Sequence, residues 1–331
     1  MTAQSVLVLG AGSWGSALAL ALARNQHSVY LWDIDSELIN NIKRNRCNNR
    51  YLPGVIFPDN LFPIGSIEEA PADIKMVVNA VPCHGLRSSL QLLKSFSDIS
   101  VCLACKGFEP GTQRLNHQVV EEELKGCSVA VLSGPSFAKE VATGLPTAVT
   151  IAAEDINVAQ AFADLFHSEV FRIYTHNDYV GVQIGGAVKN VMAIAAGIAD
   201  GLGFGANTRS ALITRGLHEI MQLGLAMGAK QETFMGLAGL GDLVLTCTDD
   251  QSRNRRLGLQ LAAGLSVQEA SDKIGQAIEG LKTAIEVGEL AKKFNIEMPI
   301  TEQVINVLKS TCSPREAVQN LLAREPRSEL D

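Results

Sequence analysis

The sequence predicts an α/β fold: an N-terminal Rossmann-like, doubly wound parallel sheet followed by an all-α C-terminal domain. Three observations support this prediction. Short apolar runs alternate with helical patterns up to about residue 152, a glycine-rich turn closes the first run, and only helix-period patterns follow residue 184. Continuous apolar strands separated by helices are typical of a parallel sheet covered on both faces.

The first half of the chain contains the expected sheet. The first apolar run, SVLVL, leads directly into a glycine turn and an Ala/Leu-rich helix, which is the start of a βαβ unit. The segment 51–63 is rich in proline and is expected to be a loop. Strands are expected at residues 5–9, 28–32, 75–81, 100–104, 128–132 and 147–152, and helices at 13–25 and 36–46.

The second half shows no alternating strand pattern. We therefore expect two domains, a nucleotide-binding sheet domain at residues 1–183 and a helical, substrate-binding domain at residues 184–331. Helices are expected at residues 186–200, 207–228, 230–236, 253–263, 266–274, 279–294 and 300–310.

Composition excludes several classes of function. A formal net charge of -7 gives no electrostatic footprint for nucleic acid or an anionic membrane. The N-terminus lacks the charged start of a signal peptide, and charged or polar residues interrupt the longest apolar run. Seven cysteines indicate free thiols in a reducing cytoplasm. Cys102 and Cys105 form a CxxC, but a strand would send their side chains to opposite faces, so no metal site is expected.

The segment GAGSWG at residues 10–15 matches the pattern GxGxxG. It follows a buried-strand pattern and opens a helix, the context in which this pattern binds a dinucleotide. The first glycine permits a tight turn, the second lets a pyrophosphate approach the backbone, and the third allows close packing of helix on strand. A glycine turn without a ligand is the alternative. The residues expected at the cofactor are Gly10, Gly12, Ser13, Trp14 and Gly15.

Asp33 ends the second expected strand. An acidic side chain at this position binds the ribose 2′-OH of NAD and repels the 2′-phosphate of NADP. Asp33 therefore favours NADH, although Arg44 and Arg46 follow at a distance from which they could reach a 2′-phosphate.

Eight segments, in order along about residues 5–320, together resemble bacterial NAD(P)-dependent glycerol-3-phosphate dehydrogenase. They are GAGSWGSALA (10–19), AVP (80–82), KGFE (106–109), SGPSFAKE (133–140), GGAVKNVMAIAAG (185–197), NTRSALITRGL (207–217), GLGDLVLTC (239–247) and SRNRRLG (252–258).

The resemblance implies reversible hydride transfer from NAD(P)H to dihydroxyacetone phosphate, giving sn-glycerol 3-phosphate for glycerophospholipid synthesis. Many members of the family carry a basic or neutral polar residue just after the second strand, consistent with NADPH. This chain departs from that pattern with Asp33 and Ile34.

Lys189 is the expected general acid and base. A ketone reductase needs a proton donor as the hydride arrives, and a lysine in apolar surroundings can have a pKa lowered towards neutrality. Lys189 lies in the apolar segment AVKNVMAIAAG, with Asn190 beside it. The resemblance implies the same role. The alternative is a lysine whose head group reaches the surface.

Two further residues are expected at the chemistry. Lys106 follows the strand run VCLAC, at the carboxyl edge of the sheet where ligands bind. It is expected to touch substrate and cofactor, unless it is a surface lysine. Asp242 is a glycine-flanked carboxylate in an apolar stretch, and a buried carboxylate needs a partner. We expect it to pair with a catalytic lysine or with a substrate hydroxyl; a helix N-cap is the alternative.

Ser252, Arg253 and Asn254 begin an expected helix. A helix start with a guanidinium suits a phosphate monoester, so these residues are expected to hold the substrate phosphate. Arg253 is also expected near the cofactor. A solvated basic helix face is the alternative, and it is the expected role of Arg255 and Arg256.

Four positions rest on the resemblance alone. It implies that Gly134 and Ser136 contact the substrate and that Ala138 and Glu279 contact the cofactor. The roles of Thr208 and Arg209, at the active site or at a subunit interface, stay open in the sequence.

Two other functions compete with this one. Another reductase of the same build could act on a hydroxy acid or on phosphogluconate, but the SRN and GLGD segments favour the first interpretation. A sensor that binds NAD(P)H without turnover would not need Lys106, Lys189 and Asp242 together. A homodimer is expected, because helical substrate domains often bury an interface.

Overall fold

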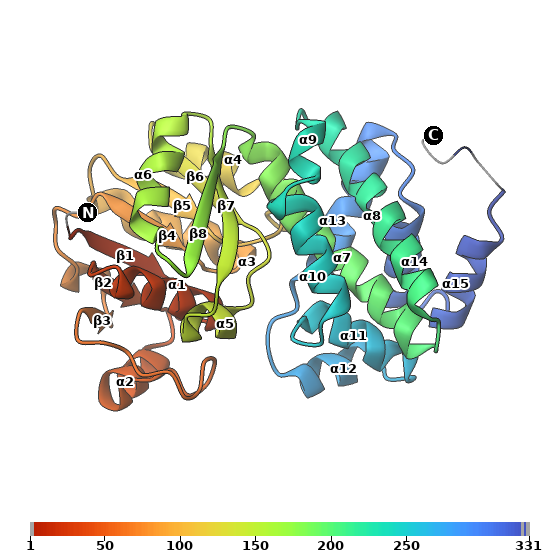
Figure 1. The fold of residues 1–331 in the computed structure, drawn as a ribbon, viewed down its shortest axis with the longest axis horizontal. Coiled ribbons are helices and arrows are strands. Elements are labelled where there is room, and N and C mark those ends of the chain that lie inside the picture. The colour runs from red at the N-terminus through yellow and green to blue at the C-terminus, as the bar shows by residue number, and fades with distance from the viewer. Residues whose placement is uncertain (1–2, 326–327, 329–331) are drawn as a thin grey trace.

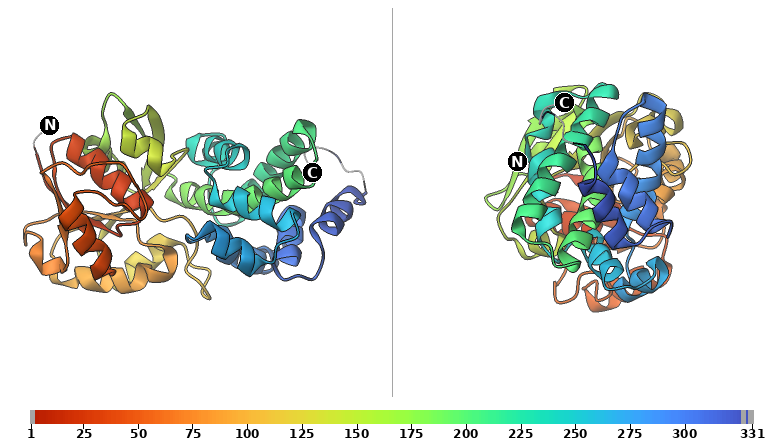
Figure 2. Two further views of the ribbon diagram at one scale, coloured as in Figure 1. Left: turned by 90° about the horizontal axis from the view of Figure 1, so that it is seen from below. Right: turned by 90° about the vertical axis from the view of Figure 1, so that its right-hand side faces the viewer.

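The computed structural model describes residues 3–325 and 328. It has two parts, a sheet flanked by helices and a bundle of helices, with the last helix, α15, on the side of the bundle away from the sheet (Figure 1). The long helix α7 (Tyr179–Gly201) leads from the first part into the second. The view from below shows the same two lobes separated along the long axis (Figure 2). This arrangement confirms the predicted fold class.

The sheet has eight strands in the order β3-β2-β1-β4-β5-β6-β7-β8. Neighbouring strands pair in parallel from β3 through β6. The strands are β1 (Ser5–Leu9), β2 (Ser28–Trp32), β3 (Leu61–Ile64), β4 (Met76–Asn79), β5 (Ser100–Leu103), β6 (Ser128–Ser133), β7 (Thr147–Ala153) and β8 (Phe171–His176).

The sheet is not fully parallel, because β7 runs antiparallel to β6. A parallel return needs a crossover that spans the length of the strand. The only helix between β6 and β7 is α5 (Ala138–Thr143), whose six residues extend about 9 Å, half of the ~20 Å of a six-residue strand. The chain therefore turns back along the edge of β6 instead of crossing over it.

The two strands that the sequence did not reveal are the two edge strands. β3 falls at the end of the segment expected to be a loop and contains Pro63, which an edge strand tolerates because one side makes no ladder hydrogen bonds. β8 has an exposed or half-buried residue at most positions, so it lacks the continuous apolar run of a central strand.

Helices cover both faces of the sheet. Val6 and Val8 of β1 belong to one apolar cluster, and Leu7 and Leu9 belong to a second cluster on the opposite face. This is the alternation that a strand imposes. The α-helices of this part are α1 (Ser13–Arg24), α2 (Ser36–Asn45), α3 (Cys83–Gln91), α4 (Asn116–Glu123), α5 and α6 (Ile156–Phe166), and two short 3-10 helices are η1 (Ile67–Glu69) and η2 (Leu92–Ser95).

The C-terminal part packs around α7. This helix is long and apolar enough to cross a membrane, but the apolar window is wholly buried inside the structure, as in the core helix of a bundle. The bundle has its own apolar core. Its other helices are α8 (Ala206–Ala226), α9 (Gln231–Phe234), the single π-helical turn η3 (Leu237–Gly241), α10 (Asp242–Thr248), α11 (Arg253–Ala262), α12 (Val267–Ile274), α13 (Glu279–Phe294), α14 (Pro299–Leu308) and α15 (Pro314–Leu322).

Candidate active site

The glycine-rich turn joins β1 to α1. Gly10 has a positive φ of 96°, which favours glycine, and its N–H donates to the Trp32 carbonyl at 2.7 Å. A Cβ on Gly15 would lie 1.8 Å from the Gly10 carbonyl oxygen, so only glycine lets α1 pack against the turn. A Cβ on Gly12 would meet nothing within 4 Å. No side chain among the described residues caps the N-terminus of α1. The turn therefore presents open space and helix N–H groups to a ligand.

The two glycines are expected to respond differently to alanine. Gly15→Ala should lower the free energy of unfolding by about 2 kcal/mol or more, because the added carbon overlaps the backbone. Gly12→Ala should leave the melting temperature nearly unchanged and weaken the binding of NADH, which a fluorescence titration measures. Equal loss of stability in both variants would contradict this assignment of space beside Gly12.

Asp33 lies beside the turn. One carboxylate oxygen accepts from the Ala11 N–H at 2.6 Å and the other from the Asp35 N–H at 2.9 Å. The carboxylate is therefore fixed next to the glycine loop, at the end of β2. The Arg46 guanidinium donates to the carbonyls of Phe57, Pro58 and Leu61. Arg46 thus fastens the loop before β3. Trp14 donates from Nε1 to the Ala104 carbonyl at 3.2 Å.

Lys189, Lys106 and Asp242 meet where the two parts of the chain join. Asp242 begins α10, and its two carboxylate oxygens accept from different lysines. Oδ1 accepts from Lys189 Nζ, and Oδ2 accepts from Lys106 Nζ at 2.7 Å. The side chains are 1%, 8% and 14% exposed for Asp242, Lys189 and Lys106. Asp242 therefore pairs with both lysines and is not a helix N-cap.

Burial is the main influence on the protonation of Lys189. It lowers the pKa of Lys189 from 10.5 to about 8; the Asp242 carboxylate opposes this shift, and the positive charge of Lys106 adds to it. A lysine with a pKa near 8 can donate and accept a proton close to neutral pH.

Thr246 is a further member of this cluster that the sequence did not indicate. Its hydroxyl accepts from Lys189 Nζ at 2.9 Å and donates to the Asp242 carbonyl at 2.6 Å. Thr246 lies four residues after Asp242, so both fall on one face of α10. That spacing was the available signal, but no helix was expected there.

Asn190 and Asn254 link three helices behind the lysines. Asn254 Nδ2 donates to Asn190 Oδ1 at 2.9 Å, and Asn254 Oδ1 accepts from the Gly280 N–H at 3.0 Å. Asn190 Nδ2 reaches Glu279 Oε2 at 3.4 Å. Glu279 is half-buried, and partial burial of its carboxyl raises its pKa, while the nearby positive charges of Arg253, Lys106 and Lys189 oppose the rise. Glu279 and Arg253 therefore share the electrostatic environment of the two lysines.

Ser252 is the N-cap of α11, because its hydroxyl accepts from the Arg255 N–H at 3.2 Å. The expectation that Arg255 belongs to a solvated face is wrong. Arg255 is buried and forms ion pairs with Asp200 and with Asp250, the latter at 2.9 Å. A buried guanidinium needs such partners. Asp200 lies on α7, far from Arg255 in the sequence, so this ion pair is not visible from the local pattern. Arg256 is half-buried.

The segment after β6 contains Gly134, Ser136 and Ala138, three residues expected at the active site. The Gly134 carbonyl accepts from Lys106 Nζ at 3.2 Å and from the Ser136 hydroxyl at 3.0 Å. Gly134 has a φ of 143°, and a Cβ there would lie 3.0 Å from Val149 Cα, so glycine is required. Ala138 is the first residue of α5. The loop thus carries a backbone contact to the lysine cluster.

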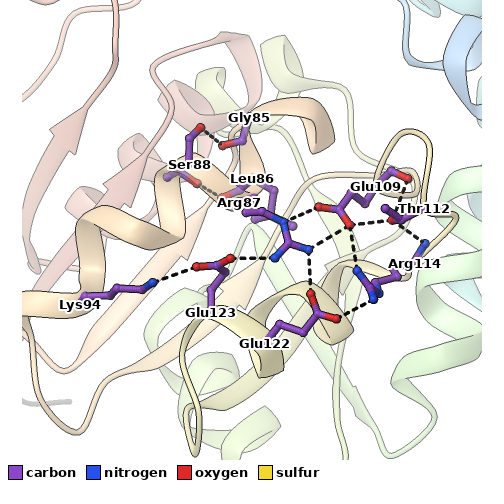
Figure 3. A network of polar contacts seen from close by, with 11 residues as sticks. Gly85, Leu86, Arg87, Ser88, Lys94, Glu109, Thr112, Arg114, Glu122 and Glu123 are labelled. Atoms are coloured by element: carbon purple, nitrogen blue, oxygen red, sulfur yellow. Dashed lines mark hydrogen bonds and ion pairs between the residues drawn. The ribbon is translucent and has the colours of Figure 1, made fainter.

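The segment after Lys106 is fastened on two sides. Arg87 of α3 binds Glu109 at 2.8 Å and also pairs with Glu122 and Glu123 of α4, forming the network in Figure 3. Glu286 of α13 accepts from the Gly111 N–H at 2.8 Å and from Gln113 Nε2 at 2.9 Å. These contacts tie the Lys106 segment both to the sheet part and to the helical part.

Thr208 and Arg209 lie away from the lysine cluster. Arg209 Nη1 donates to Asp200 Oδ2 at 2.9 Å, beside the Arg255 ion pair. Thr208 lines a cleft of about 770 Å³ between helices of the bundle. Neither residue has a contact with Lys189, Lys106 or Asp242 in the described part of the chain.

Comparisons with known proteins cover most of the chain. Residues 5–159 match the family model for the NAD-dependent glycerol-3-phosphate dehydrogenase N-terminus, and residues 178–319 match the model for its C-terminus. A Nitrosococcus oceani protein named glycerol-3-phosphate dehydrogenase (NAD(P)+) is 55% identical over 98% of this chain and 95% of its own length. A Shewanella sediminis protein of the same name is 51% identical over 98% and 97%.

A solved structure shows the same fold. The crystal structure of glycerol-3-phosphate dehydrogenase from Coxiella burnetii is 44% identical and covers 97% of this chain and 99% of that one, with a TM-score of 0.94. A D-mandelate dehydrogenase structure is 14% identical with a TM-score of 0.62, which shows a shared fold alone.

Proposed function

Since the chain belongs to the NAD-dependent glycerol-3-phosphate dehydrogenase family, we propose that it transfers hydride reversibly from NAD(P)H to dihydroxyacetone phosphate, giving sn-glycerol 3-phosphate. The observation that carries the mechanism is the buried cluster in which one carboxylate, Asp242, holds two lysines.

The cofactor fits the glycine turn. Gly12 leaves open space beside the backbone, α1 presents an N-terminus, and Asp33 stands at the end of β2. These features would hold the pyrophosphate and the adenine ribose. Two residues of α1 and four residues outside the glycine turn would complete the cofactor site. They are Ser13 and Trp14, and Lys106, Ala138, Arg253 and Glu279. When bound, the reduced nicotinamide supplies the hydride.

Residues of the chain transfer the proton and stabilise the negative charge at the substrate oxygen. Lys189 donates a proton to the oxygen on C2 of the substrate as negative charge develops there, and in the reverse direction its neutral amine removes that proton. Lys106 stabilises the same oxygen with a positive charge, which acts strongly in a site poor in water. Asp242 orients both ammonium groups, and Gly134 and Ser136 border the substrate.

We assign the substrate phosphate to the N-terminus of α11, where Ser252, Arg253 and Asn254 lie. Asn254 is already held by Asn190 and Gly280, so it would act from a fixed position. Arg253→Ala should raise KM for dihydroxyacetone phosphate by about 10- to 100-fold, the loss of a charge-assisted hydrogen bond. Steady-state kinetics measures this, with the exposed Arg315→Ala as control. An equal effect on unphosphorylated dihydroxyacetone would contradict a phosphate contact.

We also assign a preference for NADH to Asp33. Its carboxylate is fixed by two backbone N–H groups and would face the negative 2′-phosphate of NADPH. Asp33→Asn should shift the ratio of kcat/KM values towards NADPH by roughly 10-fold, about 1.4 kcal/mol. The exposed Asp59→Asn serves as a control. An unchanged ratio would show that another residue selects the cofactor.

The proposed activity is tested by its product. The enzyme is incubated with NADH and dihydroxyacetone phosphate, and the product is analysed for sn-glycerol 3-phosphate with a stereospecific assay. A 2-keto acid and, with NAD+, phosphogluconate are offered in parallel. Faster turnover of either alternative would replace the proposed substrate.

We further propose a cytoplasmic homodimer that supplies glycerophospholipid synthesis and binds neither nucleic acid nor membranes. The net charge of -7 and the free state of the seven cysteines support this setting. Gel filtration with light scattering would give twice the mass of the chain for a dimer.

A further inference from the structure

A loop of residues 107–115 follows Lys106 and leads from β5 to α4. It closes on itself through an antiparallel bridge between Phe108 and Leu115. Both side chains are buried in the apolar cluster of the helical bundle, although β5 and α4 belong to the sheet part. The loop therefore leaves the sheet part, packs into the helical part and returns.

Arg87 of α3 binds this loop to the sheet part. Its guanidinium makes two contacts with Glu109, from Nε to Oε1 at 2.8 Å and from Nη2 to Oε2 at 3.1 Å. Such a pair fixes the direction of the carboxylate as well as its distance. Arg87 also binds Glu122 and Glu123 of α4 (Figure 3). The bond from Arg87 holds the pKa of Glu109 below its usual value, so Glu109 stays charged at neutral pH.

Glu286 of α13 binds the same loop to the helical part. This residue is 7% exposed, and its two carboxylate oxygens accept from the Gly111 N–H at 2.8 Å and from Gln113 Nε2 at 2.9 Å. A buried carboxylate needs such partners, so Glu286 and the loop hold each other in place. One charged side chain from each part of the molecule therefore fastens the loop.

Lys106 depends on this loop for its position. Its ammonium reaches from the end of β5 to Asp242 of α10 at 2.7 Å, and it also donates to the Gly134 carbonyl at 3.2 Å. The contact with Asp242 joins the two parts of the molecule, so it persists only where the parts stay at a fixed distance. A flexible lysine side chain does not fix that distance by itself. The loop begins at the next residue and binds both parts.

We propose that Arg87 and Glu286 are positioning residues that hold the loop of residues 107–115 between the two parts and so keep the Lys106 ammonium on Asp242. Both act through Lys106 and not on the substrate. The consequence for turnover rests on the proposed function, in which Lys106 stabilises the substrate oxygen. Since a displacement of about 1 Å can cost on the order of 100-fold in rate, partial release of Lys106 should lower kcat by about 10-fold.

The first test observes Lys106 without any substrate. Wild type, Arg87→Ala and Glu286→Ala are treated with a trace of acetic anhydride, and mass spectrometry after proteolysis gives the rate of acetylation of Lys106. The Lys106 side chain is 14% exposed while it pairs with Asp242. Its release should raise the rate of acetylation by about 5-fold, the change in population that one hydrogen bond controls.

Two matched variants serve as controls in this test. Lys94→Ala removes an ion pair with Glu123 from the network around Arg87 but leaves Glu109 bound. Glu289→Ala removes an exposed carboxylate of α13, one turn after Glu286. Both controls should keep the wild-type rate of acetylation, because neither loses a contact with the loop.

The second test asks whether the two positioning residues act through Lys106. The kcat for reduction of dihydroxyacetone phosphate should fall about 10-fold in Arg87→Ala and in Glu286→Ala. Added to Lys106→Ala, either substitution should change kcat by less than about 2-fold, because the group that it positions is already gone. Arg87→Lys and Glu286→Gln keep part of each contact and should recover part of kcat. They also serve as the test where an alanine variant does not fold.

The outcomes separate this proposal from the proposed function. An unchanged rate of acetylation in Arg87→Ala and Glu286→Ala, an equal rise in the controls, or an undiminished loss of kcat in the Lys106→Ala background would overturn the positioning role. Faster acetylation of Lys106 in variants of an enzyme that never reduces dihydroxyacetone phosphate would support that role and contradict the proposed function.

Discussion

Lys189→Ala is expected to lower kcat by about 10²- to 10⁴-fold, the range for loss of a general acid and base. Affinity for NADH should change little, because Lys189 lies on α7 and not at the glycine turn. Steady-state kinetics gives kcat, and a fluorescence titration gives the dissociation constant of NADH. The exposed Lys309→Ala is the matched control. Equal loss of cofactor binding would remove Lys189 from the chemistry.

The pH dependence of the wild-type enzyme should report the ionisation of Lys189. Reduction needs the ammonium form of Lys189, so its rate should fall as the pH rises through about 8, the pKa set mainly by burial. Oxidation of sn-glycerol 3-phosphate needs the neutral amine and should rise over the same interval. Profiles that move in the same direction for both reactions would contradict this assignment.

Asp242→Asn is expected to have the second large effect. The substitution keeps the shape but removes the carboxylate that bridges the buried Lys189 and the half-buried Lys106, so the pKa of Lys189 should fall below its wild-type value. Reduction at neutral pH should fall on the order of 100-fold, as when one preorganised electrostatic group is lost. The free energy of unfolding should fall by about 3 kcal/mol, because a buried pair is broken.

Rate and stability are measured on the same preparation, by kinetics and by urea unfolding, with the exposed Asp272→Asn as control. The pH profile for oxidation should move to lower pH in Asp242→Asn. A profile that stays in place, with full activity, would show that Asp242 does not control Lys189.

The central strands were predictable because they are buried on both faces. Such strands are continuous apolar runs, and β1, which is buried from Val6 to Leu9, was expected at the residues where it occurs. β2 was also expected at its residues, although its burial alternates. The edge strands β3 and β8 lack that signal, since β3 contains a proline and β8 has a buried residue only at its start, with the others half-buried or exposed. The antiparallel direction of β7 depends on how the chain turns after β6, which periodicity does not report.

The glycine turn was predictable in detail because its sterics are local. A Cβ on Gly15 would overlap the Gly10 carbonyl five residues earlier, and Gly10 has a positive φ, although a Cβ on Gly10 would also lie 3.0 Å from the distant Ala80. The lysine cluster was predictable only in part. The sequence identified Lys106, Lys189 and Asp242 individually. It did not show that one carboxylate binds both lysines, because that contact depends on how the helical part packs against the sheet.

The wrong expectation for Arg255 and the missed residue Thr246 both arise because their contacts depend on the tertiary fold. Arg255 stands among other arginines in the sequence, which suggests a surface residue. Its partner, Asp200, lies 55 residues away on α7. Thr246 carried no signal once α10 was missed. The functions of individual site residues stay predictions that the variants above address.

The most direct test of the central claim is the consumption of NADH and of NADPH by the wild-type enzyme, each with and without dihydroxyacetone phosphate, followed by the absorbance of the reduced nicotinamide. We predict consumption that depends on dihydroxyacetone phosphate and is faster with NADH. Measurable binding of both cofactors without consumption in the presence of dihydroxyacetone phosphate would contradict the account.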